Sequence, residues 1–107
     1  MADIDLWYVQ QFAKFLDKLN QVKDADGKTL LHNSMIVYGS GNADANRHTH
    51  SNLPILLAGA GGGALKTGRY IKHAAEPLTN LFLSLGHTLG VAKLERFGDS
   101  TAPLKNI

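Results

Sequence analysis

The chain contains no cysteine and no long apolar run. The absence of cysteine excludes disulfide bonds, thiolate metal sites and a cysteine nucleophile. No stretch reaches the roughly 18 apolar residues that a membrane-spanning helix needs, so no membrane association is expected. The N-terminus carries Asp3 and Asp5 where a secretory signal needs basic residues, and the chain as written is therefore predicted to be cytoplasmic.

Clustered charge of one sign is also missing. The formal net charge is +2 and the basic residues are scattered, with no five-residue basic cluster. Nucleic acid is therefore not an expected partner. With 107 residues, 44% apolar and 19% charged, the chain has the composition of one soluble globular domain, residues 1–107.

Two segments have the periodicity of amphipathic helices. Residues 4–22 place large apolar side chains at helical spacing, with Asp3 or Asp5 as candidate N-caps. Residues 77–90 form the second, opened by a proline and closed by a glycine. The predicted apolar stripe of the first helix is expected to belong to the core and consists of Tyr8, Phe12, Phe15, Leu16 and Leu19. That of the second helix consists of Leu78, Leu81, Phe82, Leu85 and Leu89.

Two short apolar runs, residues 34–38 and 53–58, predict buried strands because of their length and β-branching. Residues 24–27 predict a turn, residues 59–63 a flexible turn, and residues 64–72 a short hairpin arm that is broken by Gly68. The predicted fold is α/β, a small sheet of buried strands with a hairpin arm, covered by two amphipathic helices. So small a sheet leaves exposed edges, which favours a homo-oligomer.

The stretch from Gly39 to Pro54 holds the strongest candidate for chemistry. His48 and His50 form a His-x-His pair, and in an extended segment both side chains point to the same side. Two neutral imidazoles on one side can share a metal ion, and Asp44 can add a carboxylate oxygen. The sequence therefore predicts a divalent metal site at Asp44, His48 and His50, with zinc and calcium among the candidate ions. A solvated polar loop is the alternative.

Known motifs with the same core do not fit. Metallo-β-lactamase-type hydrolases need His-x-His-x-Asp-His, but Asn52 stands in the aspartate position. Cupins need a glutamate a few residues after the pair, and the nearest later acid is Glu76. The glycines of residues 59–63 lack the lysine and hydroxyl residue of a phosphate-binding loop. His32 and His73 are expected at the surface and His87 at the edge of the core.

Three stretches together resemble the C-terminal part of a bacterial family of unknown function named for a His-x-x-Ser-His-His motif. They are YGSGNADANRHTHSNLPILLAGAGGGALKTGRYIKH, EPLTNLFLSLGHTLGV and FGDSTAPL. The resemblance implies a longer parent protein, distantly similar to the alkaline phosphatase and sulfatase superfamily, whose relatives look exported. It gives His48 or His50 the part of a later metal ligand, with Asp44 as companion. The naming motif itself is absent from this chain.

The leading hypothesis from the sequence is a metal-dependent hydrolase of phosphate, sulfate, carboxylic ester or lactone bonds, or the remnant of one, acting on a small-molecule substrate. A non-catalytic binding module that oligomerises is the first alternative. A copper-binding redox protein that uses the His pair is the second. No catalytic residue beyond the metal ligands is assigned.

Overall fold

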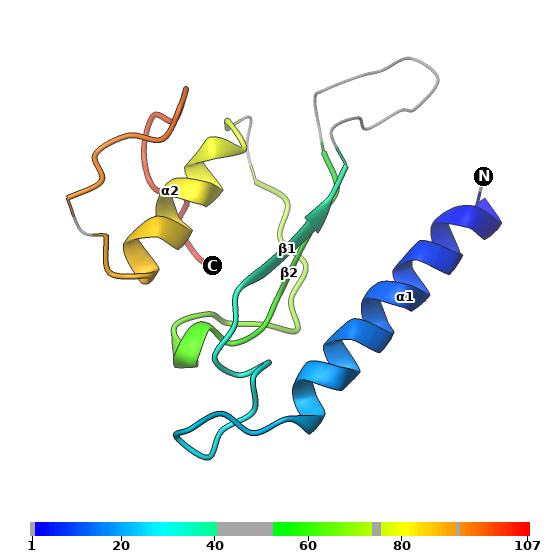
Figure 1. Ribbon diagram of the computed structural model, residues 1–107. Helices are drawn as coiled ribbons and strands as arrows, with labels where there is room; N and C mark the ends of the chain where they lie inside the picture. Colours follow the sequence, from blue (N-terminus) through cyan, green and yellow to red (C-terminus); the bar gives the residue numbers. More distant parts are fainter. Residues whose placement is uncertain (1, 41–52, 74–75, 92) are drawn as a thin grey trace.

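The structure, a computed structural model, describes residues 2–40, 53–73, 76–91 and 93–107 (Figure 1). Within them the chain forms helix α1, the two strands β1 and β2, a short 3-10 turn and helix α2, in that order. The two strands make a small antiparallel sheet, which confirms the predicted small α/β fold. No helix in this part of the chain is long and apolar enough to cross a membrane.

Helix α1 spans Ala2–Gln21, close to its predicted range. Asp3 and Asp5 lie in its first turn rather than at the cap. In the first turn their negative charges interact favourably with the positive end of the helix dipole. Phe12 packs on Tyr38 of β1, with ring centroids 4.7 Å apart. The prediction that the whole aromatic stripe is core is wrong, because Tyr8 and Phe15 remain about half exposed, at 55% and 49%.

Strands β1 (Ile36–Gly39) and β2 (Ile55–Ala58) pair antiparallel, with Ile36 opposite Ala58 and Gly39 opposite Ile55. Both were predicted to be buried, and this is wrong. Residues of β1 are half-buried or exposed, and Leu56 of β2 is 49% exposed. In a sheet of two strands, each strand has a neighbour on one edge only. The faces of this sheet are also covered only in part, so neither strand is fully buried.

The turn after β2 depends on glycine. Gly59 has φ +91°, and a Cβ there would overlap the carbonyl oxygen of Ser34, so only glycine fits. The chain then makes a 3-10 turn at Gly61–Gly63. The predicted hairpin arm over residues 64–72 is wrong, because these residues form no strand. Gly68, at φ +74°, turns the backbone out of the strand conformation in the middle of that range.

Helix α2 spans Thr79–Thr88, and Gly90 with φ +95° ends it as predicted. Its buried face is Asn80, Leu81, Leu83 and Ser84, so the predicted stripe is only partly right. Leu83 is 1% exposed, whereas Leu89, which belongs to the predicted apolar stripe, is 74% exposed. Across the described residues the buried apolar core consists of Leu65, Leu81 and Leu83.

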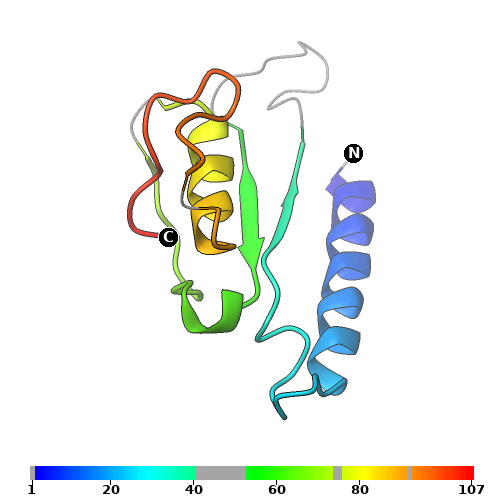
Figure 2. The ribbon, with the colours of Figure 1, turned by 60° about the vertical axis from the view of Figure 1, so that its left-hand side comes forward.

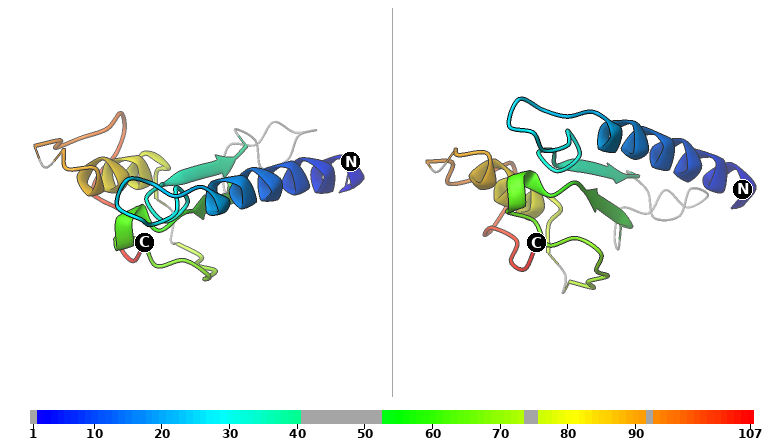
Figure 3. Two further views of the ribbon diagram at one scale, coloured as in Figure 1. Left: turned by 60° about the horizontal axis from the view of Figure 1, so that its bottom comes forward. Right: turned by 90° about the horizontal axis from the view of Figure 1, so that it is seen from below.

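The β1–β2 hairpin lies between the two helices, with α1 on one side and α2 on the other (Figures 1 and 2). Helix α1 runs alongside the hairpin in the further views as well, including the one from below (Figure 3). Among the elements described, only β1 and β2 contact each other extensively. The fold is therefore a central hairpin with one helix on each side, and each helix has few direct contacts with the strands.

Candidate functional site

The hairpin determines where the predicted metal-binding stretch is attached. Asp44, His48 and His50 all lie in residues 41–52, outside the described residues. The strand residues that flank this stretch are described, and Gly39 is paired directly with Ile55. The connection between β1 and β2 therefore begins and ends at neighbouring residues, at the same end of the hairpin. Its two attachment points are held by the backbone pairing of the strands.

The three described histidines have separate surroundings. His73 is exposed, and its Nδ1 lies 3.6 Å from Glu76 Oε2. His87 is half-buried, with Nε2 2.6 Å from the carbonyl oxygen of Leu94, in agreement with its predicted place at the core edge. His32, predicted to be at the surface, is half-buried instead, and its Nε2 atom is buried without a hydrogen-bond partner. No three metal-ligating side chains converge within the described ranges.

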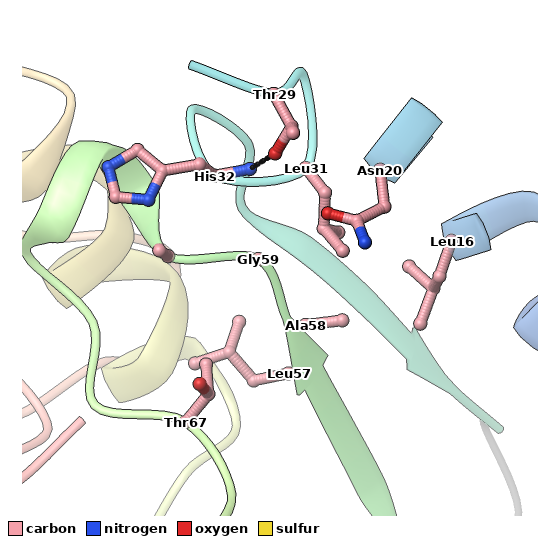
Figure 4. A pocket seen from close by; sticks show the side chains of 10 residues that line it. Leu16, Asn20, Thr29, Leu31, His32, Leu57, Ala58, Gly59 and Thr67 are labelled. Atoms are coloured by element: carbon pink, nitrogen blue, oxygen red, sulfur yellow. Dashed lines mark hydrogen bonds between the residues drawn. The ribbon is translucent and has the colours of Figure 1, made fainter. Parts of the chain in front are cut away.

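A shallow cleft of about 420 Å³ lies where α1, residues 29–32 and the end of β2 meet (Figure 4). Leu16, Leu31 and Ala58 give it apolar walls, and Asn20 adds an amide. The imidazole of His32 extends away from Leu16 and Asn20 in this view. Its backbone N–H donates to the Thr29 hydroxyl at 3.0 Å. The polar groups therefore do not converge on one point, and the cleft alone indicates no particular ligand.

The turn between α1 and β1 is fastened by carboxylates. Asn33 Nδ2 donates to Asp24 Oδ2 at 3.1 Å and to both carboxylate oxygens of Asp26. The backbone N–H of Lys28 donates to Asp26 Oδ1 at 2.9 Å. These bonds, the one from Lys28 first and those from Asn33 second, hold the pKa of the Asp26 carboxyl below its usual value. The predicted turn at residues 24–27 is confirmed, with Gly27 at φ +82°.

Sequence reasoning missed the most deeply buried polar side chain of the described residues, that of Asn80. Its side chain is completely buried in α2, and Oδ1 accepts from Thr101 N at 2.9 Å and from Ala102 N at 3.5 Å. Its own carbonyl accepts from Leu104 N at 3.1 Å. Ser84, one turn later, donates to the Leu104 carbonyl at 2.7 Å. A lone asparagine among the apolar residues of a helix was the available indication, since a buried amide needs partners.

The stretch Phe97–Thr101 is attached to the same helix. Thr79 donates its hydroxyl proton to Asp99 Oδ1 at 2.6 Å, and Phe97 packs edge-on against Phe82 at 5.6 Å. Ser100 Oγ accepts from the backbone N–H of Phe97 at 2.8 Å. Asp99 and Ser100 therefore have a structural role: they belong to a turn that anchors the C-terminal segment to α2. The C-terminal segment is defined as residues 93–107. These contacts leave the β1–β2 connection as the candidate site.

Comparison of the chain with protein-family models, with curated proteins and with solved structures finds no match.

Proposed function

We propose that the protein binds a divalent metal ion through Asp44, His48 and His50 and uses it to hydrolyse an ester-type bond of a small molecule. The observation that carries this proposal is the pairing of Gly39 with Ile55. This pairing holds the two ends of the stretch that carries the three residues close together, so the stretch begins and ends at one place in the fold.

The donor set suits the chemistry. Two neutral imidazoles and one carboxylate are a ligand combination that zinc accepts in catalytic sites, with a position left for water or substrate. A metal ion held there would supply a bound water of lowered pKa and polarise the ester-type bond. The residues of this chain would hold the ion and orient the substrate. The bonds considered are phosphate, sulfate, carboxylic ester and lactone.

Metal analysis of the purified protein tests the site directly. We expect one ion per wild-type chain after dialysis, and its loss from the His48→Ala/His50→Ala double variant. His73→Ala, which removes an exposed histidine outside the connection, is the matched control and should keep the metal. An unchanged metal content in the double variant would exclude these ligands. Absorption spectra after copper loading would distinguish a redox site from a hydrolytic one.

Activity gives the second readout. Chromogenic phosphate, sulfate and acetate esters and a lactone should be assayed before and after chelation, and then after zinc or calcium is restored. We expect hydrolysis of at least one of them to disappear with the chelator and to return with the metal. Hydrolysis that survives complete removal of metal would contradict a metal-dependent mechanism.

A non-catalytic binding module that oligomerises is the second candidate function. It is supported by large apolar side chains that α1 exposes, among them Ile4, Trp7, Tyr8 and Phe15, each about half exposed. A set of this size on one helix is typical of an interaction surface. A metal-free, inactive protein that forms stable oligomers would favour this candidate.

A further inference from the structure

We propose that α1 pairs antiparallel with α1 of a second copy of this chain. The inference deepens the second candidate function, because it names the surface and the partner, and it requires neither metal nor activity. The surface is the α1 stripe, defined as Ile4, Tyr8, Gln11 and Phe15. The steps of four, three and four residues place these side chains along one side of the helix, in the pattern of a coiled-coil seam.

The α1 stripe is distinct from the side of the helix that meets the hairpin. Phe12, Leu16 and Leu19 are the half-buried apolar residues of α1, and Phe12 contacts Tyr38. At 100° per residue, Ile4 and Gln11 are turned well away from Leu16. Ile4, Tyr8 and Phe15 are 56%, 55% and 49% exposed, and Gln11 is half-buried. The helix therefore has two adjacent apolar sides, and the hairpin covers only one of them.

Charge complementarity favours a second copy of the chain as the partner of the α1 stripe. Asp3, in the first turn of α1, and Lys14 and Lys18, in its second half, are all exposed. The helical period puts all three, together with Trp7, on the same flank of the α1 stripe. In a twofold antiparallel pair, this flank faces the same flank of the partner with the direction reversed. The acidic beginning of one helix then meets the basic second half of the other.

The spacing allows two such contacts in one register. Asp3 and Trp7 are separated by four residues, as are Lys14 and Lys18. If Asp3 faces Lys18 of the partner subunit, Trp7 faces Lys14 of the partner subunit, which gives an ion pair and a cation–π contact. Ile4 then lies close to Phe15 of the partner subunit. A parallel pair would instead set Lys14 and Lys18 against the same lysines of the other copy, and the helix dipoles also favour the antiparallel arrangement.

Sedimentation equilibrium of the full chain and its variants tests the pairing. We expect a wild-type dimer. Phe15→Gln should raise its dissociation constant about a hundredfold, since an apolar group is lost from both copies. Lys18→Asp or Asp3→Lys alone should raise it about tenfold, and the combined Asp3→Lys/Lys18→Asp variant should restore it. Leu89→Gln, at a 74% exposed apolar residue beyond α2, is the control and should have no effect.

The orientation can be read in a second experiment, because the chain has no cysteine of its own. The register places Gln11 beside Gln11 of the partner subunit, so Gln11→Cys should form a disulfide-linked dimer under mild oxidation. Asp3→Cys alone should not, whereas Asp3→Cys/Lys18→Cys should. Cross-linking by Asp3→Cys alone would mean a parallel pair and would overturn the proposal.

The outcomes separate this inference from the function on which it rests. A chain that stays monomeric at all concentrations overturns both the pairing of α1 and the oligomerising module. A dimer that is unaffected by Phe15→Gln and Lys18→Asp overturns the α1 pairing and leaves the module in place. Circular dichroism of each variant confirms that a weaker dimer does not result from loss of the fold.

Discussion

Helices α1 and α2 are both amphipathic, yet they are attached to the molecule in different ways. Helix α2 is bonded by side chains and backbone to the C-terminal segment through Thr79, Asn80 and Ser84. Helix α1, twice as long, packs Phe12 against Tyr38 of the hairpin and leaves most of its large apolar side chains exposed to solvent. The comparison teaches that length and apolar periodicity form a helix, whereas fixed partners decide how firmly it is held.

The largest expected difference between the two helices is in apolar burial. Leu83→Ala in α2 should lower the free energy of unfolding by about 2–5 kcal/mol, because a fully buried leucine leaves a cavity. Leu6→Ala, at a 55% exposed leucine of α1, should change it by no more than about 0.5 kcal/mol. Urea denaturation followed by circular dichroism measures both. Equal losses would show that α1 is as firmly packed as α2.

The next largest effect is expected at the buried amide. Asn80→Ala removes the acceptor of the Thr101 and Ala102 N–H groups and should cost about 1–3 kcal/mol. Hydrogen exchange of the Thr101 amide should become faster at the same time. Asn20→Ala, at an exposed asparagine of α1, is the control. Unchanged protection of Thr101 would show that the C-terminal segment is held by other contacts.

Loss of a single hydrogen bond between α2 and the C-terminal segment should have a smaller effect on stability. Ser84→Ala deletes the donor to the Leu104 carbonyl and should lower stability by about 1 kcal/mol. Because only the hydroxyl oxygen is removed, the space left behind is small and adds little to the loss. Exchange rates and the urea midpoint are the measurements, and Ser84→Thr would retain the donor. A stability equal to wild type in Ser84→Ala would count against this bond.

The smallest effect is expected at the turn that joins α1 to the hairpin. The folded-state pKa of Asp26 lies below its value in the unfolded chain, so its carboxylate stabilises the fold at neutral pH. That contribution is lost as the pH falls below 3.8 and through the folded-state pKa. Asp26→Asn should therefore be slightly less stable than wild type at pH 7 and lose this difference in acid. Because Asp26 is exposed, the difference is small. Parallel urea curves at pH 7 and pH 3 measure it.

The two helices, the turn at residues 24–27 and the hairpin strands could be predicted from local patterns, because helical periodicity, glycine and short β-branched runs act over a few residues. Burial could not. Leu89 belongs to the apolar stripe of α2 and is exposed, while Ser84 is polar and buried. Which face of α2 is covered depends on the C-terminal segment, about 20 residues later in the chain, and no local pattern records that contact.

The candidate site was predicted as a set of residues, and the described structure adds the geometry of its attachment. The sequence proposes Asp44, His48 and His50 from ligand chemistry, which is a property of side chains alone. The pairing of Gly39 with Ile55 is a property of the fold. The hairpin arm predicted at residues 64–72 was expected to break at Gly68, and the positive φ of this glycine agrees with that, but the residues on either side of it form no strand.

The attachment of α2 to the C-terminal segment has a consequence for synthesis of the protein. A ribosome makes chains from the N-terminus, so α2 is complete before Thr101, Ala102 and Leu104 have been added. Until then Asn80 lacks the backbone donors that it accepts in the folded state. The two strands of the hairpin, by contrast, are consecutive in the chain and precede α2, so they can pair before the C-terminal segment is made. The residues that hold α2 in place therefore leave the ribosome about 20 residues after Asn80, and the attachment of α2 cannot form before they do.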